Sequence, residues 1–183
     1  MVQHTDHMNE DYKTLFRTIG EICLLKRSPS HVPESADLQR KMLFLYVLTA
    51  SLGVFLGNET SLLMAFGQAI LEALLLMLFM YLLLNHFSFI NRFKQTTTAL
   101  YASGTLISLI STPFVYQVGV LSQKQQALGL LGWLVFIMVC WSFVVMAHII
   151  RCSIQKNLMT SLLLSFCYVY LSYQLISRVF PLT

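Results

Sequence analysis

Charged residues are scarce in this chain. Asp, Glu, Lys and Arg make up 11% of the sequence, whereas apolar residues make up 56% and the mean hydropathy is +0.67. An ordinary soluble domain has about 25% charged residues. The composition therefore excludes an ordinary soluble domain, and apolar runs of about twenty residues predict an all-α integral membrane protein.

The residues that build common catalytic and metal sites are also few. The four cysteines form no CxxC pair, and their spacing fits neither a zinc site nor a disulfide framework. No glycine-rich phosphate loop is present, and the apolar spans contain one carboxylate, Glu72, and one histidine, His148. We therefore predict that the protein is not an enzyme and has no cofactor or metal. A rarer alternative is haem bound by His86 and His148, which follow or end two different spans.

Five apolar stretches are long enough to cross a bilayer. They cover residues 38–57, 62–84, 96–120, 127–150 and 158–177. Together they predict a five-helix transmembrane bundle over residues 38–183, preceded by a polar segment over residues 1–37. Pro113 should kink the third span or end its regular part, because proline removes a helical hydrogen bond.

Basic residues are distributed unevenly between the two sides of these spans. If the amino end is cytosolic, ten of the twelve Lys and Arg residues are cytosolic and only Lys124 and Arg178 are outside. This bias predicts a cytosolic N-terminus and a C-terminus on the opposite side. The net charge of +4 then indicates attraction to anionic lipids and not to nucleic acid. The residues expected to contact lipid headgroups are Arg27, Arg40, Lys41, Arg92, Lys94, Arg151 and Lys156.

Residues 11–27 have the spacing of a short amphipathic helix. Its apolar positions are Leu15, Phe16, Ile19, Ile22 and Cys23. Such a helix lies either in the cytosolic headgroup layer or against the bundle or a partner. We favour the headgroup layer.

Polar residues within the spans form a second candidate site. Gln68 and Glu72 are four residues apart in the second span, and a carboxylate at that depth is costly unless it is protonated, paired or hydrated. In the third span Thr97, Tyr101, Gly104, Ser108 and Ser111 fall on one helical face. We expect this face to supply the partner of Glu72. Structural hydrogen bonding, a proton or cation relay and contact with a partner subunit remain open.

Small residues form a stripe in the first span. Thr49, Gly53 and Gly57 recur every four residues, which allows close approach of another helix, and Gly104 offers a similar position in the third span. Packing within the chain, a homodimer interface and coincidence are all compatible with this spacing.

Three stretches resemble the Yip family of multi-pass membrane proteins. They are the LLKRSP turn at Leu24–Pro29, FINRFKQTTTALYASG at Phe89–Gly104 and WSFVVMAHIIRCSIQKNLMTSLLLS at Trp141–Ser165. The chain lacks the family's glycine-rich approach to the third span, and its proline comes at Pro113, not soon after Tyr101. The resemblance implies either a bacterial inner-membrane protein or a eukaryotic protein associated with Rab-type GTPases, vesicle traffic and membrane shaping.

These patterns favour a non-enzymatic membrane scaffold or accessory protein. It is expected to bind membrane lipids and either a protein partner or another copy of itself, in a bacterial inner membrane. The alternative is a small transporter or channel with a polar path around Glu72.

Overall fold

The computed structural model describes residues 14–57, 60–125 and 127–180. Its long helices are α2 (Ala36–Gly57), α3 (Leu62–His86), α4 (Phe93–Gln123), α5 (Gly129–Ile154) and α6 (Leu158–Val179). Two 3-10 helices, η1 (Pro29–His31) and η2 (Ile90–Arg92), precede α2 and α4. The described residues include no strand, and five helices are long and apolar enough to cross a membrane. The predicted all-α five-helix membrane fold is therefore confirmed.

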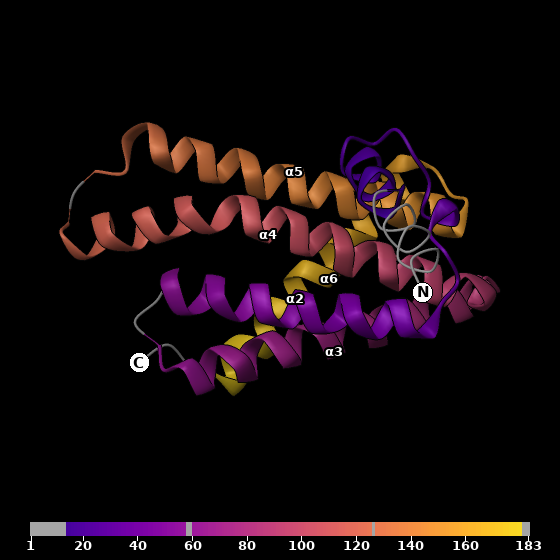
Figure 1. The fold of residues 1–183 in the computed structure, drawn as a ribbon, viewed down its shortest axis with the longest axis horizontal. Coiled ribbons are helices and arrows are strands. Elements are labelled where there is room, and N and C mark those ends of the chain that lie inside the picture. The colour runs from indigo at the N-terminus through magenta and orange to yellow at the C-terminus, as the bar shows by residue number, and fades with distance from the viewer. Residues whose placement is uncertain (1–13, 58–59, 126, 181–183) are drawn as a thin grey trace, which may run out of the picture.

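The five long helices run side by side and alternate in direction (Figure 1). α2, α4 and α6 begin at one end of the bundle, where α3 and α5 finish. We call this the basic end, because exposed cations flank the helices there. They are Arg40, Lys41, Lys94, Arg151 and Lys156. α2 packs most extensively against α4, and α5 packs against both α4 and α6.

The third span extends beyond its predicted limits at both ends. α4 extends over Phe93–Gln123 where residues 96–120 were expected, and it continues through Pro113. Ser111 Oγ and Thr112 Oγ1 both donate to the carbonyl of Ser108, at 3.1 and 2.7 Å. These side-chain bonds lie in the turn just before Pro113, which has no N–H to donate to the Leu109 carbonyl. The expectation that Pro113 ends the regular helix is therefore wrong.

The turn after α3 shows how the chain reverses at the basic end. The amide of Phe89 donates to the carbonyl of Leu84, and the amide of Ser88 donates to that of Asn85. Ser88 has a φ of 62°, so this is a Schellman ending with serine at the left-handed position. The ending positions η2 and the start of α4.

The core lies toward the basic half of the bundle. Its largest fully buried side chains include Tyr101, Ile22, Met80, Leu84 and Ile149. The first half of α5 is different, because Leu130, Trp133, Phe136 and Ile137 are all exposed. Exposed apolar side chains on a membrane span are expected to contact lipid.

Candidate functional site

Glu72 lies where three other helices meet α3. The Tyr46 hydroxyl of α2 donates to Glu72 Oε1 at 3.0 Å. Tyr168 of α6 donates to the Glu72 carbonyl at 3.4 Å, and Tyr101 of α4 donates to the Ala73 carbonyl at 2.9 Å. We call Tyr46, Glu72, Tyr101 and Tyr168 the tyrosine–glutamate cluster. It joins α2, α4 and α6 to one turn of α3.

A glycine on α4, Gly104, makes room for this cluster because it has no side chain. A Cβ at Gly104 would lie 2.7 Å from Tyr46 Cε2, so the Tyr46 ring lies directly on the glycine. The same ring is 5.4 Å from the ring of Tyr101, at an interplanar angle of 44°. The hydroxyl donor offsets part of the cost of a carboxyl group at this depth. Gly104 therefore determines whether Tyr46 reaches Glu72.

The partner of Glu72 differs from the one predicted. The sequence favoured the α4 face that includes Tyr101, Ser108 and Ser111, but the side-chain donor is Tyr46 of α2. Ser108 donates to the Thr49 carbonyl at 3.3 Å, and Ser111 to the Ser108 carbonyl of its own helix. These residues serve the α2–α4 contact and local helix geometry. A single tyrosine in an apolar span gave no periodic signal that would have pointed to Tyr46.

Gln68 lies one turn before Glu72 on α3 and is half-buried. The sequence placed both residues on one face because they are four apart. Among the described residues, hydrogen bonds connect Glu72 to α2 and α6. None of these bonds connects Glu72 to Gln68. The structure thus brings Glu72 and Tyr101 into one cluster and leaves Gln68 beside it.

The small-residue stripe of α2 faces α4. A Cβ at Gly57 would lie 2.7 Å from Val115 Cγ1, and one at Gly53 would lie 3.9 Å from Ser108 Oγ. Thr49 is buried and accepts the Ser108 hydroxyl bond through its carbonyl. Three interpretations of this stripe were left open: packing within the chain, a homodimer interface and coincidence. These contacts agree with packing within the chain.

The N-terminal segment is docked on the bundle. Residues 14–23 are helical, while residues 11–13 of the predicted helix lie outside the described part. Leu15, Ile19, Ile22 and Cys23 are buried in the same core as the side chains of α5. The favoured placement in the headgroup layer is therefore wrong for four of the five apolar positions, whereas the fifth, Phe16, is exposed. The face packs into the core that it shares with α4 and α5, and burial of its apolar side chains stabilises this docking.

Two side chains of α5 hold the end of this segment. Trp141 Nε1 donates to the Cys23 carbonyl at 3.0 Å, and His148 Nε2 lies 3.0 Å from the Arg27 carbonyl. Helix-terminal carbonyls have no partner within their own helix, so they are available to such donors. Burial raises the pKa of the Cys23 thiol to about 11, from an ordinary value near 9.

The backbone of the segment ends in a second Schellman motif. The amide of Lys26 donates to the Glu21 carbonyl at 2.8 Å, and that of Leu25 to the Ile22 carbonyl at 2.9 Å. Leu25 occupies the left-handed position with a φ of 62°, where glycine is usual. Trp141 completes this ending by taking the next free carbonyl.

The residues of the haem alternative are engaged in other contacts. One ring nitrogen of His148 lies at the Arg27 carbonyl, and the His86 ring packs edge-on against Phe87 at 5.1 Å. Within the described ranges, no group of three or more His, Cys, Asp or Glu side chains is placed to hold a metal ion. Haem binding gains no support from these contacts.

Two of the predicted lipid-contacting arginines also contact the protein. Arg92 Nη1 lies 3.4 Å from the Ser153 carbonyl at the end of α5, and its guanidinium carbon is 5.0 Å from the centre of the Phe89 ring. Arg27 pairs with Glu21 at 2.5 Å. A cation is stabilised at a helix C-terminus by the free carbonyls and the helix dipole. Both arginines therefore have protein partners that the sequence did not predict, and their headgroup contact stays a prediction.

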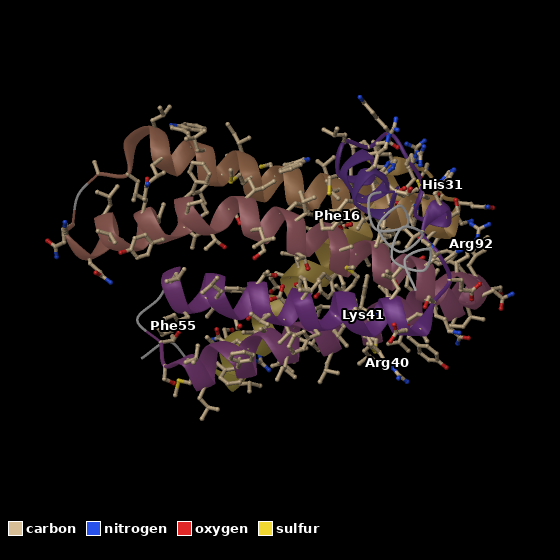
Figure 2. The ribbon with its side chains drawn as sticks, in the orientation of Figure 1. Phe16, His31, Arg40, Lys41, Phe55 and Arg92 are labelled. Atoms are coloured by element: carbon tan, nitrogen blue, oxygen red, sulfur yellow. The ribbon has the colours of Figure 1, made fainter. Side chains whose placement is uncertain are left out.

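The other predicted lipid-contacting cations remain at the surface of the basic end. Lys41 pairs with Asp37 at 2.7 Å, and Lys156 Nζ lies 5.6 Å from the centre of the Phe87 ring. Arg40, Lys94 and Arg151 are exposed. Figure 2 shows Arg40 and Lys41 on α2 and Arg92 near the end of the bundle. This exposure is compatible with headgroup contact.

Comparison of the chain with protein-family models, curated proteins and solved structures finds no match. The resemblance to the Yip family therefore stays a prediction from three sequence stretches.

Proposed function

We propose that the protein is a non-enzymatic membrane scaffold or accessory protein. The observation that carries this proposal is the N-terminal segment held on the bundle, beside the exposed cations of the basic end. Such an arrangement holds a folded surface at the membrane boundary, where lipid headgroups and peripheral proteins meet. The polar groups of the tyrosine–glutamate cluster join helices to one another, as expected of a rigid support.

The proposal is tested by recovery of bound molecules from membranes. The intact chain is purified in mild detergent at native abundance, and co-purifying proteins and lipids are identified and compared with a variant lacking residues 14–27. A defined protein or lipid lost with the segment supports the proposal. Recovery of nothing specific, with membranes unaffected by the deletion, contradicts it.

The orientation and location are part of the same proposal. The excess of basic residues at one end supports a cytosolic basic end, in a bacterial inner membrane or an endomembrane of the Yip type. Tags at the two chain ends should then label from opposite sides of the membrane. Labelling of both from one side would contradict five spans.

A transporter is the second candidate, and Glu72 is the observation that favours it. Its carboxyl group meets a tyrosine hydroxyl between helices, which is chemistry that a proton-linked carrier uses. Flux measured in proteoliposomes should then be lost in Glu72→Gln while thermal stability is kept. Equal flux in the variant and the parent protein would remove this candidate.

A further inference from the structure

The N-terminal segment has a second apolar flank that does not face the bundle. Phe16 is 68% exposed and Leu24 is 60% exposed, and Gly20 lies between them at four-residue spacing. A Cβ added to Gly20 would have no heavy atom within 4 Å. Leu25, at the left-handed position, is also exposed. We call Phe16, Gly20, Leu24 and Leu25 the open flank.

Charged residues occupy the next stripe of the same helix. Arg17 Nε donates to Glu21 Oε1 at 3.0 Å, and these two residues follow Phe16 and Gly20 by one position each. One position corresponds to about 100° around a helix. The segment thus has three sides: one packed on α5, one apolar and open, and one charged. A helix surrounded by water beyond its docked face would need no second apolar side.

The open flank lies at a depth that suits the lipid boundary. Figure 2 places Phe16 toward the middle of the bundle, set back from His31 and Arg92 at the basic end. Arg17 and Lys26 are exposed on the same segment. Exposed apolar side chains with cations beside them on one helix suit the boundary of a membrane that contains anionic phospholipid, where apolar groups meet hydrocarbon and cations meet lipid phosphates.

We propose that the open flank is a phospholipid-binding surface, which seats the docked segment in the headgroup boundary with Arg17 and Lys26 near lipid phosphates. This inference rests on the proposed function and specifies its lipid side. The helix is therefore clamped between α5 and lipid. Phe16 is the one apolar position of the predicted amphipathic helix that this proposal assigns to lipid.

A nitroxide at position 16 tests this proposal in the full chain. Phe16→Cys is labelled in a background of Cys140→Ser, Cys152→Ser and Cys167→Ser, and Cys23 stays because it is buried. The protein is placed in nanodiscs of phosphatidylcholine, with or without phosphatidylglycerol. Ser30→Cys, exposed in η1 before α2, is the matched water-facing control.

We expect collisions with oxygen, relative to a water-soluble nickel complex, to be several-fold more frequent at position 16 than at position 30. Phosphatidylglycerol should increase that difference. Equal, nickel-accessible signals at both positions would overturn the proposal. An immobilised label at position 16 that neither reagent reaches would also overturn it, because it would indicate a protein neighbour.

Variants at Gly20 give a second readout that does not disturb the bundle. Since a side chain there meets open space, Gly20→Ala, Gly20→Leu and Gly20→Asp should all preserve the docked core. Relative to Gly20→Ala, we expect Gly20→Leu to slow hydrogen exchange of the segment in nanodiscs and Gly20→Asp to speed it several-fold. Identical exchange in the three variants would contradict lipid contact. A protein partner still recovered from membranes would then leave the proposed function standing.

Discussion

In both the tyrosine–glutamate cluster and the docked end of the N-terminal segment, a neighbouring helix supplies a hydrogen-bond partner to a polar group. The surroundings of the two sites differ. In the cluster, Tyr46 donates to a side chain, Glu72, deep within the spans. At the docked end, Trp141 and His148 contact backbone carbonyls that the segment's own turn leaves free. Each of these three contacts is made by one amphipathic side chain of a neighbouring helix.

The difference between them concerns what replaces a lost bond. Hydrocarbon offers no donor to the Glu72 carboxyl group, whereas the acceptors at the docked end are neutral carbonyls, and Arg27 is partly exposed to the water and headgroups of the basic end. Loss of a donor should therefore cost more in the cluster than at the docked end. The predictions below test this order.

Gly104→Ala should have the largest effect. Its Cβ would lie 2.7 Å from Tyr46 Cε2, so the ring must move away from Glu72. Overpacking costs about 1–3 kcal/mol, and we expect the upper part of this range because the hydrogen bond is lost as well. Thermal unfolding in mild detergent measures it. The matched control is Gly53→Ala, whose Cβ would make an ordinary contact at 3.9 Å. Equal destabilisation by both would contradict the close packing of Tyr46 on Gly104.

The sequence was sufficient for the fold but not for the partners within it. Span number and approximate limits follow from hydropathy, because hydrocarbon imposes about twenty apolar residues per crossing. The tyrosine partner was missed because Tyr46 and Glu72 belong to different helices, and no periodicity links them. The protein contacts of Arg92 were missed for a similar reason, since its carbonyl partners on α5 are 60 and 61 residues away.

Tyr46→Phe should have the next largest effect. It removes the donor to Glu72 Oε1 and keeps the ring against Tyr101, so only the polar bond is lost. We expect a loss of about 1–2 kcal/mol in unfolding free energy, within the range measured for unpaired buried groups and intramembrane bonds.

Glu72→Gln is the matched control for Tyr46→Phe. Its side-chain oxygen can still accept from Tyr46, so we expect a smaller change in unfolding temperature. In the double variant the two effects should not add, because they share one hydrogen bond. Full additivity would show that Tyr46 and Glu72 do not stabilise each other.

Trp141→Phe should have a smaller effect, of about 1 kcal/mol, because one neutral hydrogen bond to the Cys23 carbonyl is lost and no carboxyl group is left without a donor. Release of the segment should appear in the reactivity of Cys23. Its pKa near 11 gives roughly a hundredfold less thiolate at pH 8 than an ordinary thiol with a pKa near 9. Alkylation of Cys23 should therefore be slow in the parent protein and faster in Trp141→Phe.

The same thiol fixes the direction of a pH effect on docking. Below about pH 9 Cys23 is protonated both docked and released, so docking is independent of its titration. As pH rises from about 9 toward 11, the released thiol ionises and the buried one resists, so this contribution to docking is lost. Cys23→Ala should show a weaker loss of docking over that range. An unchanged loss would assign the effect to another group.

Leu25→Gly should have the smallest effect and separates backbone strain from lipid contact. The left-handed conformation costs a non-glycine residue about 1–2 kcal/mol, which glycine avoids. The greater conformational freedom of glycine in the unfolded chain destabilises the folded state by about 0.5–1 kcal/mol. Strain alone therefore predicts a net gain of about 0.5 kcal/mol. Ser88→Gly, at the equivalent position after α3, should show that gain in unfolding measurements.

Leu25 also belongs to the open flank, so hydrogen exchange of the segment in nanodiscs should show less gain for Leu25→Gly than in lipid-free detergent. Equal gains in both media would mean that the leucine contacts no lipid, and that only its backbone matters.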